Sequence, residues 1–144
     1  MSDRFVGKYF NTIDQKNRII VPSKHRDLLK GKCFVSKGMD KCLNIYTVER
    51  WEAQMEKLDS LPQSDKRIRA FIRNLSGNAI ECNIDSQGRI VITDELKEYA
   101  GIDKDLVTIG ANKVIEVWDR DSYSNSVDND YSEEDIAEAL AGLY

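Results

Sequence analysis

The sequence predicts an α+β fold made of two fused repeats, each combining a β-hairpin with a short helix. Residues 13–21 (IDQKNRIIV) match residues 84–92 (IDSQGRIVI) at a displacement of 71 positions. Each copy is followed by a short helical signal that ends at a glycine, and then by two apolar runs typical of strands. Self-similarity over this length indicates that one supersecondary unit occurs twice in the chain.

Each half is predicted to run strand, tight turn, strand, short helix and hairpin. In front of the second turn, Ile80, Cys82 and Ile84 alternate with Glu81 and Asn83, as in a strand with one buried face. The expected helix and hairpin strands are 23–30, 33–36 and 43–46 in the first half, and 94–100, 106–109 and 114–118 in the second.

Two helices are predicted between the halves, separated by Pro62. Thr47 is the expected N-cap of the first, and Ser64 or Asp65 of the second. Phe71 lies beside the apolar stripe of the second helix and is expected in the core. The basic side of that helix is interpreted as a solvated face, with DNA contact as the alternative. The stripes are Trp51, Met55 and Leu58 in the first helix and Ile68, Ile72 and Leu75 in the second.

The C-terminal segment is expected to be a polar linker over 122–131, followed by a short helix that opens with a capping box at Ser132. The apolar stripe of that helix, Ile136, Leu140 and Leu143, needs a surface to pack on, in this subunit or a neighbour. The predicted organisation is a first repeat over 1–59, a linker helix over 60–75, a second repeat over 76–123, and an acidic linker with a C-terminal helix over 124–144.

Composition limits the classes of function. The chain has 144 residues and net charge −4, with 16 Lys and Arg against 9 Asp and Glu in residues 1–75, and 5 against 16 in the rest. A polyanion partner for the basic half and ordinary solvated faces are both compatible with this asymmetry. The absence of a long apolar run or secretory pattern predicts a cytoplasmic protein with no membrane partner.

The residues needed for catalysis or metal binding are few. Three cysteines, Cys33, Cys42 and Cys82, are expected to be reduced and half-buried, and the one histidine is His25. No glycine-rich phosphate loop, metal-ligand spacing or nucleophile–base pair is found. We therefore expect no enzyme activity, no small-molecule substrate, no metal and no cofactor.

The repeated turn carries an Asp-x-x-x-Arg pattern, with Asp14 and Arg18 in the first copy and Asp85 and Arg89 in the second. Each carboxylate can accept hydrogen bonds from backbone N–H groups of its turn and so shape the loop. A guanidinium presented from such a rigid hairpin suits bidentate contact with phosphate or with guanine in the major groove. The alternative is that both pairs are only structural ion pairs.

Four further loop residues join these in the candidate site. Asn17 and Gly88 precede the arginines and are residue types that accept positive φ, so they are grouped with the aspartates as loop-shaping residues. Lys16 adds a cation and Gln87 can hydrogen-bond a base edge or phosphate, so they join Arg18 and Arg89 as expected DNA contacts.

With these motifs the chain resembles the MraZ family of bacterial transcriptional regulators, whose fold is related to the swapped-hairpin AbrB-type DNA-binding domains. Asn17 stands where the family usually has glycine, and Asn11 where histidine is common. The resemblance covers roughly residues 5–123 and is carried by Phe5-x-Gly7-x-Tyr9, Asp14-x-Lys16-Asn17-Arg18, Val21-Pro22-x-Lys24-x-Arg26-Asp27, Arg73-x-x-Ser76-Gly77 and Asp85-x-x-Gly88-Arg89-Ile90.

The resemblance implies a pseudo-two-fold double-split β-barrel with linking helices, in which one chain mimics a dimer of single repeats. It also implies a nucleoid-associated regulator, a repressor of a cell-division and cell-wall gene cluster that includes its own gene. Such a protein binds repeated operator boxes on double-stranded DNA as a closed ring of subunits. The alternative hypothesis is a ring-forming scaffold or protein-interaction module that binds no DNA.

Overall fold

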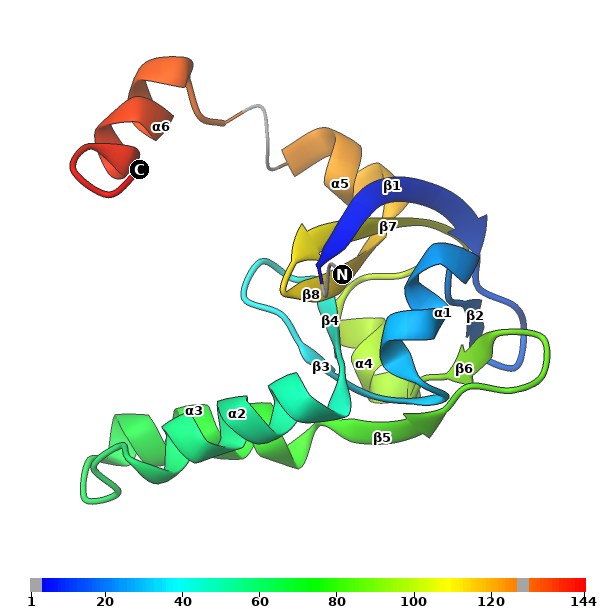
Figure 1. The fold of residues 1–144 in the computed structure, drawn as a ribbon, viewed down its shortest axis with the longest axis horizontal. Coiled ribbons are helices and arrows are strands. Elements are labelled where there is room, and N and C mark those ends of the chain that lie inside the picture. Colours follow the sequence, from blue (N-terminus) through cyan, green and yellow to red (C-terminus); the bar gives the residue numbers. More distant parts are fainter. Residues whose placement is uncertain (1–3, 127–129) are drawn as a thin grey trace.

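The strands form a six-stranded antiparallel sheet and a separate two-stranded ribbon (Figure 1). This computed structural model describes residues 4–126 and 130–144. The strands are β1 Phe5–Thr12, β2 Arg18–Ile20, β3 Lys32–Lys37, β4 Leu43–Tyr46, β5 Ile80–Asn83, β6 Arg89–Val91, β7 Asp105–Asn112 and β8 Val114–Asp119. The helices are α1 Ser23–Leu29, α2 Val48–Asp59, α3 Lys66–Gly77, α4 Asp94–Tyr99, α5 Arg120–Ser126 and α6 Glu133–Leu140.

The sheet order shows how the two repeats are combined. Strands β1 to β4 belong to the first repeat and β5 to β8 to the second, and the large sheet runs β1-β7-β8-β4-β3-β5. Exchanging each strand with its counterpart in the other repeat gives the same order read backwards. The two-stranded ribbon, β2 with β6, is likewise unchanged by the exchange. The repeats are therefore interleaved about a pseudo-two-fold axis, and the predicted α+β fold of two fused repeats is confirmed.

One hydrophobic core holds the interleaved strands together. Each repeat places an edge strand against the other repeat, β1 against β7 and β5 against β3, and β4 pairs with β8 in the middle. Neither repeat can bury its apolar side chains without the other, so burial stabilises both together. The most deeply buried large side chains include Phe5, Ile19, Leu43, Ile45, Ile90, Leu96, Leu106 and Ile115.

The two short helices that follow the ribbon strands were both predicted. Helix α1 ends at Leu29, which is buried, and its C-cap Lys30 adopts the left-handed conformation before Gly31. Helix α4 begins after Thr93, whose side chain accepts a hydrogen bond from the backbone N–H of Leu96, and it buries Leu96. Each helix is too short to be stable alone, so its buried leucine anchors it to the core.

Helices α2 and α3 form an antiparallel pair at one end of the molecule (Figure 1). Thr47 caps α2 as predicted, and Asp65 is the N-cap of α3. Leu75 is buried, but the prediction that Phe71 lies in the core is wrong, because 48% of Phe71 is exposed. Helix α3 contacts β3 and lies beside α2, and these contacts bury Leu75 but leave about half of Phe71 exposed.

The segment after β8 differs from the predicted linker. Residues 120–126 form α5, which packs on β7 and β8 and places Tyr123 against the Trp118 ring at a centroid distance of 5.4 Å. Shifting α2 by the repeat displacement gives residues 119–130, so α5 is its counterpart in the second repeat. The capping box at Ser132 is confirmed, whereas residues 127–129 of the predicted linker lie outside the described residues.

The three cysteines are free and more deeply buried than the sequence suggested. Burial raises the pKa of the Cys42 thiol to about 12, so this side chain stays protonated and packs as an apolar group beside Val107 and Trp118. Within residues 4–126 and 130–144, no helix is long and apolar enough to cross a membrane.

The buried His25 predicts a pH-dependent stability. Its ring packs edge-to-face with those of Phe5 and Tyr9 at centroid distances of 5.3 and 5.4 Å. Its Nε2 has no hydrogen-bond partner among the described residues, and burial lowers its pKa from 6.5. The unfolded chain therefore binds a proton more readily, so stability is full above pH 6.5 and falls as the pH drops below it. In urea denaturation from pH 8 to 5.5, we expect a loss approaching roughly 1 kcal/mol per pH unit below 6.5.

His25→Phe keeps an aromatic ring between Phe5 and Tyr9 but cannot titrate. Its free energy of unfolding should stay nearly flat over the same pH range. Equal losses in the variant and the natural chain would show that another group causes the pH dependence.

Candidate nucleic-acid interface

The candidate site is the two-stranded ribbon of β2 and β6 with the turn that leads into each strand. The strands run antiparallel, and their register pairs Arg18 with Val91, Ile19 with Ile90 and Ile20 with Arg89. The central pair, Ile19 and Ile90, is buried in the core. Because side chains alternate along a strand, the flanking residues point away from the core. The outer face of the ribbon therefore consists of Arg18, Ile20, Arg89 and Val91.

The first turn is closed by the carboxylate of Asp14. Its Oδ1 accepts hydrogen bonds from the backbone N–H groups of Lys16 and Arg18, each at 2.9 Å. Its Oδ2 accepts the Nε–H of Arg18 at 2.6 Å. One side chain thus holds the turn backbone and the arginine that emerges from it.

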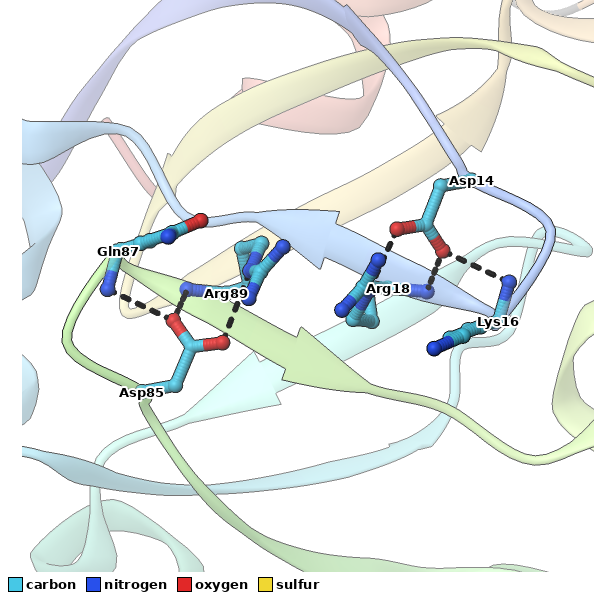
Figure 2. A network of polar contacts seen from close by, with 6 residues as sticks. All are labelled: Asp14, Lys16, Arg18, Asp85, Gln87 and Arg89. Carbon is cyan, nitrogen blue, oxygen red and sulfur yellow. Dashed lines mark hydrogen bonds and ion pairs between the residues drawn. The ribbon is translucent and has the colours of Figure 1, made fainter.

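The second turn repeats this geometry. Oδ1 of Asp85 accepts the backbone N–H groups of Gln87 and Arg89 at 2.9 and 2.8 Å, and Oδ2 accepts the Nε–H of Arg89 at 2.8 Å. Figure 2 shows the two turns at opposite ends of the ribbon, with both arginines between them. The pairing at equivalent positions of both repeats makes the site two-fold symmetric.

Backbone hydrogen bonds lock each turn to the opposite strand. The N–H of Val21 donates to the carbonyl of Gly88 at 2.8 Å, and the N–H of Ile92 donates to the carbonyl of Asn17 at 3.0 Å. Asn17 and Gly88 have φ values of 58° and 81°, which directs these carbonyls toward the neighbouring strand. Both residues are therefore required for the shape of the ribbon ends.

The two positive-φ residues have different surroundings. Asn17 donates from its side chain to Oδ1 of Asp94 at 2.7 Å, a contact between the repeats. At Gly88 a side chain would run into the guanidinium of Arg26, whose Nε donates to the carbonyl of Val21 at 2.7 Å. Arg26 and Asp94 thus belong to the site although neither was predicted as a site residue. The repeat alignment could have pointed to both positions. A basic residue recurs where Arg26 aligns with Lys97, and a polar residue recurs where Ser23 aligns with Asp94.

The arginines remain accessible although both are paired. About a quarter of each side chain is exposed, 29% for Arg18 and 25% for Arg89. Both bonds to aspartate use Nε, and no described residue bonds to the two terminal nitrogens of either guanidinium. The structural ion pairs of the alternative interpretation are thus present, and they leave the end of each guanidinium available. Lys16 and Gln87 are exposed in the turns.

The turns are electrostatically stable at neutral pH. The backbone N–H of Arg18, together with its guanidinium, holds the pKa of Asp14 below the usual 3.8, and Arg89 does the same for Asp85. Both carboxylates are therefore charged at neutral pH, and each offsets part of the charge of its arginine. Among the described residues, no three His, Cys, Asp or Glu side chains gather as metal ligands would.

Comparison with known proteins identifies the repeated unit. The model of the family described as "MraZ protein, putative antitoxin-like" matches residues 5–74 and again residues 75–143. The chain belongs to the MraZ family. It is 45% identical over 140 residues to the transcriptional regulator MraZ of Acetivibrio thermocellus, with 96% of this chain and 98% of the relative covered. It is 43% identical over 139 residues to that of Clostridium tetani, with the same coverage.

The packing at Gly88 gives a stability prediction. Gly88→Ala must adopt an unfavourable positive φ and also displace Arg26 from its bond to Val21. Gly101→Ala is the matched control, because Gly101 also has positive φ but a Cβ there would meet open space. In urea denaturation both variants should be destabilised, and Gly88→Ala by roughly 1 kcal/mol more, the value of the lost hydrogen bond. Equal destabilisation would contradict this account of the turn.

Proposed function

We propose that this chain is a sequence-specific DNA-binding transcriptional regulator whose contact surface is the β2–β6 ribbon. The observation that carries the proposal is the presence of two arginines on one outward-facing ribbon, each fixed through Nε with its terminal nitrogens available. A two-stranded ribbon fits the major groove, and two parallel N–H groups match guanine O6 and N7 or a phosphate. The names of the relatives, transcriptional regulators, support the same function.

Each site residue has a proposed role. Arg18 and Arg89 read base edges or phosphates, with Lys16 and Gln87 beside them in the turns. Asp14 and Asp85 shape the loops, with Asn17 and Gly88 at the positive-φ positions. An arginine whose Nε is already bonded loses less side-chain freedom on binding, which favours a defined contact over general attraction.

The finer function follows the resemblance to the family. The regulator represses a cell-division and cell-wall gene cluster that includes its own gene, and it works at the nucleoid on repeated operator boxes. The net charge of −4 supports the need for several subunits, because the protomer has no general attraction for DNA. A closed ring that presents one ribbon per subunit gains affinity through effective concentration.

Helix α6 is the proposed contact between subunits of the ring. Its apolar residues Ile136 and Leu140 are exposed, and its first turn is acidic. Leu143, predicted on the same stripe, is also exposed but lies in the turn beyond the end of the helix at Leu140. Figure 1 shows α6 well away from the sheet, whereas α2 and α3 lie side by side. An isolated helix of this length is marginally stable, so packing on a neighbouring copy would account for the apolar stripe.

The groove beside α3 is the complementary surface for α6. Its lining combines apolar side chains, among them Met39, Phe71 and Leu75, with polar ones that include Lys37. The acidic first turn of α6 complements that lysine. We therefore assign the groove to α6 of the adjacent subunit.

Removing the ribbon arginines tests DNA binding. The probe is the duplex immediately upstream of this chain's own coding sequence, titrated in a gel-shift assay. Arg18→Ala and Arg89→Ala should each weaken binding about 5- to 150-fold, the range for one bidentate contact, with fold and assembly unchanged. Higher salt should weaken the natural chain steeply.

Arg67→Ala is the matched control for these variants. Arg67 also pairs with an aspartate, Asp65, but it belongs to the first turn of α3. Figure 1 shows the α2–α3 pair extending away from the β2–β6 ribbon. Loss of Arg67 should leave the affinity unchanged. If the chain without both ribbon arginines bound the duplex as tightly as the natural chain, the proposal would fail. If the natural chain retained no DNA at moderate salt, the scaffold hypothesis would replace it.

Polar substitutions on α6 test the assembly. The double variant Ile136→Gln and Leu140→Gln should lower the molar mass measured by size exclusion with light scattering, because the apolar contact between subunits is lost. Phe71→Gln, on the other side of the contact, should have the same effect. Glu138→Gln on α6 is the control and should keep the full assembly. An unchanged molar mass in both test variants would refute α6 as the subunit contact.

A further inference from the structure

The outer face of the ribbon contains two exposed apolar side chains between its arginines. Ile20 is 44% exposed and Val91 is 56% exposed, although both are β-branched residues that usually pack inside. They are equivalent residues of the two repeats, at the same displacement of 71 positions as the arginines. The neighbouring pair Ile19 and Ile90 already supplies the core side of the ribbon, so the outer pair is not needed for folding.

The register places each apolar residue directly beside an arginine. Ile20 lies opposite Arg89, and Val91 lies opposite Arg18, on the same face of the ribbon. Side chains paired in this way have Cβ atoms about 5 Å apart. That spacing is one to two base-pair steps of about 3.4 Å. A base contacted by an arginine thus has a neighbour within reach of the apolar residue.

We infer that Ile20 and Val91 read thymine through its 5-methyl group, at positions adjacent to those contacted by the arginines. This inference rests on the proposed DNA-binding function of the ribbon. Only thymine presents a methyl group in the major groove, and an aliphatic side chain cannot hydrogen-bond a base edge or phosphate. Burying a methyl group against an aliphatic side chain contributes binding energy that every other base lacks at that position.

The symmetry of the ribbon adds a second consequence. Because both repeats carry the same pair of residue types, each half of the ribbon reads one arginine contact and one thymine. The two halves run in opposite directions, so the two thymines lie on opposite DNA strands. The arginines fix the position of the ribbon in the groove, and the apolar pair adds the preference for A·T base pairs next to them.

The test removes the methyl groups from the DNA without altering its base pairing. The probe is again the duplex upstream of the chain's own coding sequence, amplified with thymidine, deoxyuridine or 5-bromodeoxyuridine triphosphate. Deoxyuridine lacks the methyl group, and bromine replaces it with an atom of similar size. The natural chain should bind the deoxyuridine duplex about 15-fold more weakly, because two methyl contacts of about 4-fold each are lost. The bromodeoxyuridine duplex should restore the affinity.

The double variant Ile20→Ala and Val91→Ala should lose about the same factor on the thymidine duplex, and nearly nothing more on the deoxyuridine duplex. Val6→Ala is the matched control, since Val6 is an exposed valine on β1 outside the ribbon. It should keep the full response to methyl removal.

The outcomes distinguish the thymine inference from the proposed DNA-binding function. If the natural chain bound the thymidine and deoxyuridine duplexes equally, the thymine inference would be wrong while DNA binding stood. If the double variant kept the full difference between the duplexes, Ile20 and Val91 would not be the methyl readers. If the natural chain bound neither duplex, the proposed function and the inference would fail together.

Discussion

The site depends on one constraint: each turn aspartate must satisfy two backbone N–H groups and one arginine Nε at the same time. Asp14 and Asp85 both do so, with every bond between 2.6 and 2.9 Å. Without the carboxylate, the turn would have unsatisfied donors and the arginine would move freely. The ion pair and the proposed DNA contact are therefore linked, because the bond to aspartate orients the guanidinium that would contact DNA.

This turn with its Asp–Arg pair is present twice because the chain folds as an interleaved pair of repeats. The crossed hydrogen bonds from Val21 to Gly88 and from Ile92 to Asn17 fasten each turn to the strand of the other repeat. Ile19 and Ile90 are buried as a pair beneath the ribbon. Moving one turn relative to the other would break these contacts, so the spacing of the two arginines is set by the core.

The repeat made much of the fold and site predictable from the sequence. Equivalent positions gave the strands, the short helices and the residues of both turns, since local patterns and turn chemistry determine them. Three features were not predicted from the sequence. The exposure of Phe71 depends on how few elements cover α3. Arg26 reaches Gly88 only through tertiary packing. The sequence of α5 is polar, and its helix depends on the packing of Tyr123 against Trp118. The repeat offset, applied to α2, would have placed a helix there.

Whether the ribbon contacts DNA can be measured by amide hydrogen exchange of the full chain, with and without the duplex upstream of its coding sequence. We expect DNA to slow exchange in the two turns and the ribbon, over residues 14–20 and 85–91, in both repeats together. Slower exchange confined to α3 or α6, with the ribbon unchanged, would contradict this expectation.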